Sequence, residues 1–167
     1  MGFAVWFLSV SKQEADKLME CPEDIRVITY DDYEGVENSH ELMHPSELSL
    51  LLGAEFADDE FIPSNINSSD FDCTFLWDNG ELIEDPEDFD AAVIFFYDSQ
   101  VADTSHWLNA ISKEDFQKRF ESDIYEDDEF YDAARNFEDV WNDFVKLRTF
   151  FNTEAEKEHA IVMMSSS

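Results

Sequence analysis

The residues with the most potential for chemistry in this sequence are carboxylates that lie close together without a basic neighbour. Residues 78–90 read DNGELIEDPEDFD and hold seven Asp or Glu residues, with no Lys or Arg among them. A second run, ESDIYEDDEFYD, spans residues 121–132. Such runs can bind a metal ion, supply a pair of catalytic acids, form a solvated loop or present a surface to a basic partner. The spacing of the acids helps to separate these chemistries.

A histidine pair is the second candidate for chemistry. Residues 40–44 read HELMH and match the H-E-x-x-H pattern, in which two His residues one helical turn apart bind zinc and the Glu acts as general base. Pro45 follows directly and disfavours a helical conformation at His44. Ser46 has the character of a helix N-cap, so we expect residues 40–44 in a loop or its approach. We predict no metal ligand here, and a zinc hydrolase stays an alternative.

The acidic runs lack the spacing of a calcium site. An EF-hand loop needs acids at alternating positions, a Gly at the sixth position and a Glu at the twelfth, and neither run keeps that order. A pair of glycosidase carboxylates stays open, because their separation is a property of the tertiary structure. The sequence has no G-x-S-x-G motif and only four Gly, without a phosphate-binding Gly loop. We therefore expect a protein that is not an enzyme and has no cofactor.

The distribution of charge favours a basic partner. The 41 Asp and Glu residues face ten Lys and Arg, which gives a formal net charge of -31, whereas a magnitude of about 2 to 8 suffices for a small soluble domain. Between Arg26 and Lys113 no Lys or Arg occurs, although these 86 residues hold 21 acids. An imbalance confined to one region favours a surface for a basic ligand. The evenly acidic surface of a halophilic protein stays an alternative.

We predict that the partner-binding residues lie in the two acidic runs. They are Asp78, Glu81, Glu84, Asp85, Glu87, Asp88, Asp90, Glu126, Asp127, Asp128 and Glu129. Carboxylates on a rigid domain can imitate duplex DNA, which carries about one negative charge per 1.7 Å. Aromatic residues inside the runs are candidate anchors or ordinary core residues, namely Phe89, Tyr125, Phe130 and Tyr131. The sign of the charge disfavours direct binding of nucleic acid.

Apolar and β-branched runs recur along the chain and predict the strands of a sheet. This sheet must position the acids. Strands are expected at residues 2–10, 25–30, 73–77, 91–97 and 159–164. The run at 91–97 has the character of a central strand, and the final run fits beside the first. Residues 61–70 read as a polar loop, and the DNG sequence after residue 77 indicates a turn.

Helices are expected between the strands. Ser11 and Glu14 form a capping-box pattern that opens a short helix with Ala15, Leu18 and Met19 on its inner face. A second helix should run from Ser46 and close at Gly53. A third helix follows Asp98, with an inner face formed by Val101, Ala102, Leu108 and Ile111. Ser112 should cap a fourth helix that contains Phe116 and Phe120.

The clearest helix lies near the C-terminal end of the chain. Its apolar residues are three or four positions apart, with one basic interruption at Arg148. The stripe is formed by Phe137, Val140, Trp141, Phe144, Leu147, Arg148 and Phe151.

Composition places the protein in the cytoplasm. Two cysteines, Cys21 and Cys73, make no disulfide framework and indicate a reducing compartment. The first residues lack the basic segment of a signal peptide. No stretch approaches the 18 apolar residues of a membrane span, so we expect no contact with a membrane.

Several segments resemble the YfbM-like family of uncharacterised bacterial proteins. The resemblance lies in MGFAVWFLSVS at the start, LNAISKEDFQKRF and VWNDFVKLRTFF in the C-terminal half, and AEKEHAIVMMSSS at the end. Residues 30–90 depart from the family. The resemblance implies a small cytosolic α+β domain and supplies no catalytic residue. It also implies similarity to proteins found among toxin-immunity loci.

These observations predict one α+β domain over residues 1–167. A small mixed or antiparallel sheet should pack against several helices, with a long C-terminal amphipathic helix before the final strand. The expected function is that of a non-enzymatic, immunity-type inhibitor that occludes a basic protein such as a toxin, a nuclease or a nucleic-acid-binding protein. The alternatives are a nucleic-acid mimic that blocks a DNA-binding, RNA-binding or defence protein, and a zinc hydrolase built on HELMH.

Overall fold

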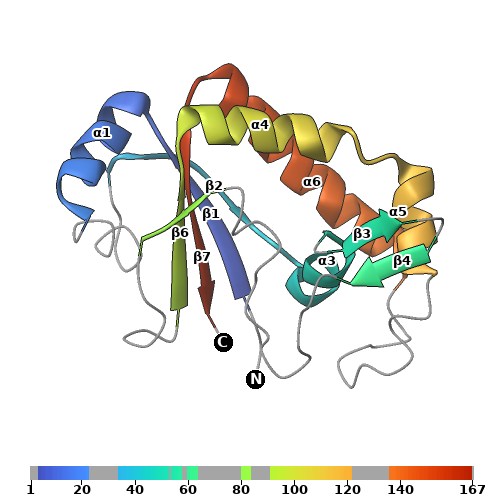
Figure 1. Ribbon diagram of the computed structural model, residues 1–167. Helices are drawn as coiled ribbons and strands as arrows, with labels where there is room; N and C mark the ends of the chain where they lie inside the picture. Colours follow the sequence, from blue (N-terminus) through green and yellow to red (C-terminus); the bar gives the residue numbers. More distant parts are fainter. Residues whose placement is uncertain are drawn as a thin grey trace.

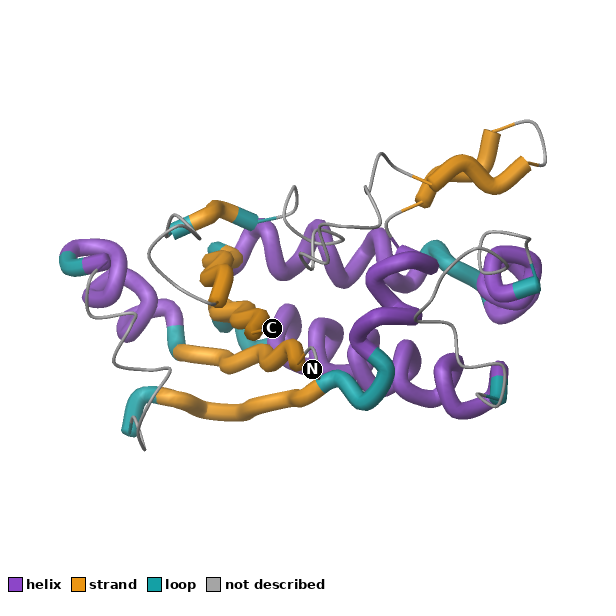
Figure 2. The backbone as a smooth tube through the Cα atoms, turned by 90° about the horizontal axis from the view of Figure 1, so that it is seen from below, coloured by secondary structure: helices purple, strands orange, loops and turns teal. Residues whose placement is uncertain are grey.

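Five strands form one antiparallel sheet in the order β2-β1-β7-β6-β5 (Figures 1 and 2). The computed structural model describes residues 4–22, 34–52, 54–57, 60–63, 80–83, 91–121 and 136–166. The strands of the sheet are β1 (Ala4–Val10), β2 (Val36–Glu41), β5 (Glu81–Leu82), β6 (Ala91–Phe96) and β7 (Ala160–Ser166). The final strand pairs with the first, as expected. The strand β6 is interior as expected, and the middle position belongs to β7.

Both faces of the sheet are covered, which is why its inner strands are apolar throughout. On one face Phe7, Phe96 and Met163 belong to a core shared with four helices, α3 (Pro45–Leu52), α4 (Asp98–Asn109), α5 (Lys113–Phe120) and α6 (Phe137–Glu156). On the other face Phe95 and Val162 pack with α1 (Lys12–Glu20) (Figure 1). Successive residues of a strand point to opposite faces, so a strand buried on both sides needs a continuous apolar run. The apolar runs at 2–10, 91–97 and 159–164 meet this need.

The helices begin and end close to the expected positions. They are α1 (Lys12–Glu20), α3 (Pro45–Leu52), α4 (Asp98–Asn109), α5 (Lys113–Phe120) and α6 (Phe137–Glu156). Ser11 Oγ accepts a hydrogen bond from Glu14 N at 3.1 Å, and Ser112 Oγ accepts one from Asp115 N at 3.1 Å. Both N-caps are therefore confirmed. The N-cap expected at Ser46 is wrong, because α3 already begins at Pro45 and Leu48 N–H donates to His44 O at 3.1 Å. None of the described helices is long and apolar enough to cross a membrane.

The inner face of α4 differs from the expected one at two positions. Ile111 is buried but follows the end of the helix at Asn109. Val101 and Leu108 are fully buried, but Ala102 is exposed. Its place on the buried side is taken by Thr104 and Ser105. Ser105 Oγ donates a hydrogen bond to Asn152 Oδ1 on α6. The apolar pattern missed this face because α4 meets α6 partly through hydrogen-bonded polar groups.

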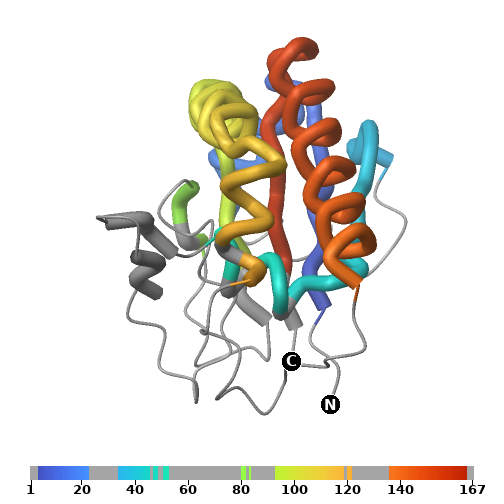
Figure 3. Tube along the Cα trace, turned by 90° about the vertical axis from the view of Figure 1, so that its right-hand side faces the viewer, coloured from blue at the N-terminus to red at the C-terminus, as the bar shows by residue number. Residues whose placement is uncertain are grey.

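The helix α6 is the longest helix of the described residues and lies against the sheet beside α4 (Figure 3). Its expected stripe is confirmed, with Val140, Phe144, Leu147 and Phe151 fully buried. Each such side chain contributes about 1.5 to 3 kcal/mol through burial. The basic interruption at Arg148 is accommodated because its guanidinium lies over two rings, 5.5 Å from the Trp141 centroid and 5.4 Å from the Phe144 centroid.

A small hairpin corrects the loop expected at residues 61–70. The strand β3 (Ala54–Ala57) pairs with β4 (Glu60–Pro63), so residues 61–63 are a strand. Phe61 and Ile62 favour a strand, but Pro63 disfavours one. The proline is tolerated because it stands at the end of β4. The strands expected at 25–30 and 73–77, the helix end at Gly53 and the rest of the loop lie outside the described residues.

Gly80 explains why β5 can approach β6 closely. A Cβ atom at this position would lie 2.7 Å from Ile94 Cγ2 and 2.9 Å from the backbone oxygen of Phe95. Only a residue without a Cβ fits at such a distance. Asp78 and Asn79, the other residues of the expected turn, lie outside the described residues. The expected α+β architecture, with a long helix before the final strand, is confirmed.

Candidate functional site

The histidine pair lies on a strand and the connection that follows it. His40 and Glu41 end β2, and residues 42–44 connect this strand to α3 at Pro45. Residues four apart on a strand are separated by about 13 Å, whereas the zinc motif needs both rings on one face of a helix. The expected loop thus begins only after Glu41. Among the residues that the structure describes, no group of three or more His, Cys, Asp or Glu side chains is arranged to hold a metal ion.

The His40 ring is part of the aromatic core. It stacks on Phe7 with a centroid distance of 6.4 Å and on Phe150 at 5.8 Å, with interplanar angles of 25° and 27°. Burial lowers the pKa of His40, and this effect exceeds the opposing influence of the nearby Asp143 carboxylate. The ring therefore packs as a neutral aromatic side chain at neutral pH.

Asp143, a buried acid on α6, holds the connection between β2 and α3. Its Oδ2 atom accepts hydrogen bonds from the backbone N–H of Met43 at 3.0 Å and of His44 at 2.7 Å. Hydrogen bonds to a carboxylate are about twice as strong as neutral ones. The backbone around Met43 is thereby fixed, although the Met43 side chain is 70% exposed.

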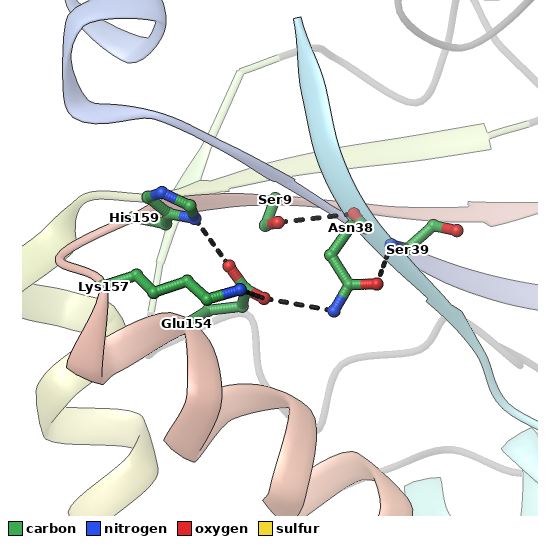
Figure 4. Close-up of polar contacts among 6 residues, drawn as sticks. All are labelled: Ser9, Asn38, Ser39, Glu154, Lys157 and His159. Atoms are coloured by element: carbon green, nitrogen blue, oxygen red, sulfur yellow. Dashed lines mark hydrogen bonds and ion pairs between the residues drawn. The ribbon is translucent and has the colours of Figure 1, made fainter.

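A second buried acid on α6 holds the other end of β2. The Glu154 side chain is fully buried, and its Oε1 atom accepts a hydrogen bond from Asn38 Nδ2 at 3.1 Å (Figure 4). Its Oε2 atom lies 2.7 Å from His159 Nδ1, which precedes β7. Lys157 Nζ lies 3.9 Å from Oε1. Ser9 Oγ on β1 donates to the backbone oxygen of Asn38 at 3.4 Å. One carboxylate thus joins α6 to β2 and to the approach of β7.

The polar partners keep Glu154 ionised. Burial by itself would raise the pKa of Glu154, but hydrogen bonds from Asn38, His159 and Ser9, together with the charge of Lys157, outweigh burial and lower it. Because the carboxylate is ionised, it accepts a hydrogen bond from His159 Nδ1–H and fixes the orientation of that ring.

The spacing of the two acids matches the length of the strand that they hold. Asp143 and Glu154 are eleven residues apart on one helix, which corresponds to about 16 Å along its axis. Asn38 and Met43 are five residues apart, or about 17 Å along an extended chain. The acid nearer the start of α6 binds the end of β2, so helix and strand run in opposite directions. Residues at both ends of the edge strand are therefore hydrogen-bonded to α6.

The strand β2 is polar, and no other described strand covers its outer side. Its exposed residues are Glu37, Asn38, Ser39 and Glu41. β2 pairs with β1 only, among the described strands. Met43, two residues beyond the end of the strand, is the large hydrophobic side chain that stays exposed among the described residues. We name the surface formed by Glu37, Ser39, Glu41 and Met43 the β2 edge.

The charged residues of the strands all have one sign. The described strands carry five charged residues, namely Glu37, Glu41, Glu55, Glu60 and Glu81. The Lys and Arg residues of the described segments lie on helices or at a helix C-cap. Several of them are paired, such as Lys12 with Asp98 at 3.2 Å and Lys113 with Glu138 at 3.1 Å. Both edge strands of the main sheet thus present carboxylates without a cation on the same strand.

One of the predicted partner-binding residues lies in the described part of the chain. Glu81 is exposed on β5, the edge strand opposite β2. The other predicted residues, and the aromatic residues at 89, 125, 130 and 131, lie outside the described residues. Their role as a recognition surface stays a prediction.

Sequence patterns missed the residues that hold β2 against α6. Asp143 is three residues after Val140, and Glu154 is three residues after Phe151, so both acids fall on the buried side of α6. A carboxylate at the spacing of the apolar stripe was the available signal. Its partner Asn38 gave no signal, because it lies 116 residues away in the sequence.

Comparison with known proteins places the chain in a family. A family model described as "Domain of unknown function (DUF1877)" matches residues 1–164. The chain belongs to the DUF1877 family. The match includes residues 30–90, which we expected to depart from the family, so the resemblance of the two ends extends through the centre. No curated protein matches the sequence.

A solved structure supports the same fold for this DUF1877 protein. YfbM from Escherichia coli, described as a protein of unknown function, is similar with a TM-score of 0.64 and 13% sequence identity. The similarity covers 96% of this chain and 98% of that chain. At this identity the likeness shows the fold alone.

Proposed function

We propose that this DUF1877 protein is a non-enzymatic inhibitor that binds and occludes a basic protein partner, in the manner of an immunity protein. The observation that supports the proposal is the single sign of the charge on the described strands, where every charged residue is Glu. Edge strands of ordinary proteins often carry Lys, which prevents association equally well. Prevention of aggregation therefore does not explain why the charged residues of the described strands are all acidic, whereas contact with a basic protein surface does.

The electrostatics of such a partnership follow from the net charge. With a formal charge of -31 the protein attracts a basic surface over several ångströms, and this attraction raises the association rate. At about 0.15 M ionic strength the screening length is about 8 Å, so the attraction weakens at higher salt. We place the interaction in the cytoplasm, where the exposed free thiol of Cys21 stays reduced.

The test is affinity capture followed by measurement with the purified partner. The immobilised protein is exposed to an extract of its native host at about 50 mM salt. The retained protein is identified, purified and titrated calorimetrically. We expect a partner of high isoelectric point, and at least a tenfold loss of affinity between about 50 and 500 mM salt. Its identity distinguishes a toxin from a nucleic-acid-binding protein that is blocked by mimicry.

Charge-reversal variants locate the recognition surface. The first variant changes Glu84, Asp85, Glu87 and Asp88 to Lys, and the second changes residues 126–129 to Lys. The matched control changes four exposed acids on helices, Asp16, Glu20, Asp103 and Glu156, to Lys and so alters the net charge equally. We expect at least one acidic-run variant to bind about tenfold more weakly than the control. A partner whose affinity changes with neither salt nor charge reversal would overturn the proposal.

A further inference from the structure

The outer side of β2 combines an open strand edge, two carboxylates and an exposed apolar side chain. We propose that the basic partner contributes an extended segment that pairs with the β2 edge as a sixth strand of the sheet, with Met43 as its apolar contact. This inference rests on the proposed function and names the form in which the partner binds. Addition of a strand to a sheet edge is a general mode of peptide recognition.

The hydrogen bonds of the strand show which backbone groups are open. Leu42 N–H donates to Val5 O at 3.1 Å, so Leu42 faces β1. Alternate residues of an antiparallel strand face the same neighbour, and His40 and Asn38 therefore also face β1. Ser39 and Glu41 direct their backbone N–H and C=O groups outward. In agreement with this, Ser39 N–H donates to the side-chain oxygen of Asn38 at 2.9 Å rather than to β1 (Figure 4).

The Asn38 side chain occupies the place of an incoming strand at this N–H group. A carbonyl oxygen of the added segment would replace Asn38 Oδ1 as the acceptor of Ser39 N–H. The Nδ2 group of Asn38 stays bound to Glu154, so the strand itself need not move. Because α6 already holds both ends of β2, little conformational freedom is lost on the side of this protein.

The carboxylates of β2 favour a basic segment over a second copy of this chain as the added strand. A second copy of the chain would set the carboxylates of Glu37 and Glu41 against an identical strand, and like charges opposite each other are destabilising. A segment with Lys or Arg at alternate positions is instead attracted by the same two carboxylates. The other edge strand, β5, has two residues in the described part of the chain. The strand β2 has six residues without proline, and its pairing with β1 has an irregularity at Glu37, between Val36 and Asn38.

Met43 supplies the apolar part of the surface. Its side chain is 70% exposed while its backbone N–H is held by Asp143. Methionine is enriched at protein interfaces and adapts to different neighbours. Met43 lies two residues after Glu41, so its exposed side chain adjoins the end of the strand that carries Ser39 and Glu41.

The probe for the test is a blocked eight-residue peptide of alternating lysine and valine. Binding to the 15N-labelled protein is followed by NMR at about 50 mM salt. We expect shifts at Ser39, Glu41 and Met43, together with slower amide exchange at Ser39 and Glu41. The same peptide with every backbone nitrogen methylated keeps its charge but cannot donate hydrogen bonds. It should bind at least about tenfold more weakly, and a glutamate-valine peptide should not bind.

Variants of the protein separate strand addition from general attraction. Glu37→Lys with Glu41→Lys should weaken peptide binding at least about tenfold, and Met43→Ser about threefold. The control, Asp16→Lys with Glu20→Lys on α1, alters the charge equally and should change the affinity by less than about threefold. Circular dichroism and NMR spectra confirm that each variant is folded.

The outcomes distinguish this inference from the proposed function. Equal binding of the methylated and unmethylated peptides, or no loss in the Glu37 and Glu41 variant, overturns strand addition while capture of a basic host protein leaves the proposed function intact. Absence of any basic partner in the capture experiment overturns both. A dimer in analytical ultracentrifugation that is disrupted by Glu41→Pro would show that a second copy occupies the edge.

Discussion

Glu154 is a fully buried acid that is stabilised in its charged form. Its two oxygens bind Asn38 on one side and His159 on the other, and Lys157 lies nearby. Removing one partner of such a group leaves a buried charge or donor unsatisfied, which typically costs about 1 to 3 kcal/mol. The residue therefore links the stability of the fold to the position of β2.

We expect Glu154→Gln to reduce stability in a pH-dependent way. The pKa of Glu154 is lowered by folding, so its contribution is present above the unfolded pKa of about 4.3 and is lost as the pH falls through the folded pKa. At pH 7 the variant should lose about 1 to 3 kcal/mol of unfolding free energy. The difference from the wild type should shrink as the pH decreases from 5 to about 3, and urea unfolding at a series of pH values measures it.

The neighbouring exposed acid gives the control for this prediction. Glu156→Gln changes the same charge on the same helix at an exposed position, and it should alter the free energy of unfolding by less than about 0.5 kcal/mol. A difference between the Glu154→Gln variant and the wild type that is constant with pH would contradict the assignment of Glu154 as an ionised buried group.

At the scale of elements, the connection between α6 and β7 brings His159 to Glu154. The helix ends with two hydrogen bonds of the Schellman type, from Glu158 N to Ala155 O at 3.1 Å and from His159 N to Glu154 O at 3.0 Å. Glu158 has a φ of 56°, a left-handed conformation that is usually occupied by glycine. Glu158 thus places a Cβ atom at a position of this turn where a Cβ atom is unfavourable.

We expect Glu158→Gly to stabilise the protein. Glycine relieves the left-handed strain of about 1 kcal/mol, and part of this gain is offset by the greater freedom of the unfolded chain. The net increase in the free energy of unfolding should be about 0.5 kcal/mol, measured by urea denaturation. The control Glu158→Ala removes the same charge without relieving the strain and should give no increase.

The elements also show which local signals were sufficient. Ser11, Ser112 and the stripe of α6 predicted helices correctly, because caps and apolar periodicity are properties of neighbouring residues. The strand β4 was taken for a loop, because three residues ending in proline carry little β signal of their own. Backbone pairing with β3 stabilises this strand, although its local sequence has little preference for β structure.

At the scale of the whole molecule, the net charge of -31 opposes the compact state. Each carboxylate is repelled by the others, and folding brings them closer together than they are in the unfolded chain. The aromatic core compensates, with residues such as Phe7, Phe96, Phe144 and Phe151 fully buried. The acids therefore affect stability mainly through their summed field, which salt screens.

We expect the protein to be folded at low salt and to become more stable as salt is added. Between about 20 and 500 mM NaCl the melting temperature should rise by about 3 to 10 °C, because screening removes part of the repulsion. The rise should be smaller in the control variant with Lys at positions 16, 20, 103 and 156, whose net charge is smaller in magnitude. Unfolding at low salt, followed by circular dichroism, would instead support the halophilic alternative.

The sequence by itself determined the class of the fold, most of the helices, the paired first and last strands and the excess of acid. These follow from composition and from patterns between near neighbours. Only the tertiary structure placed His40 against Phe150 in the aromatic core and brought Asp143 and Glu154 to the two ends of β2. The reason is physical, because these contacts join residues about a hundred positions apart, and no local pattern records which strand a helix will cover.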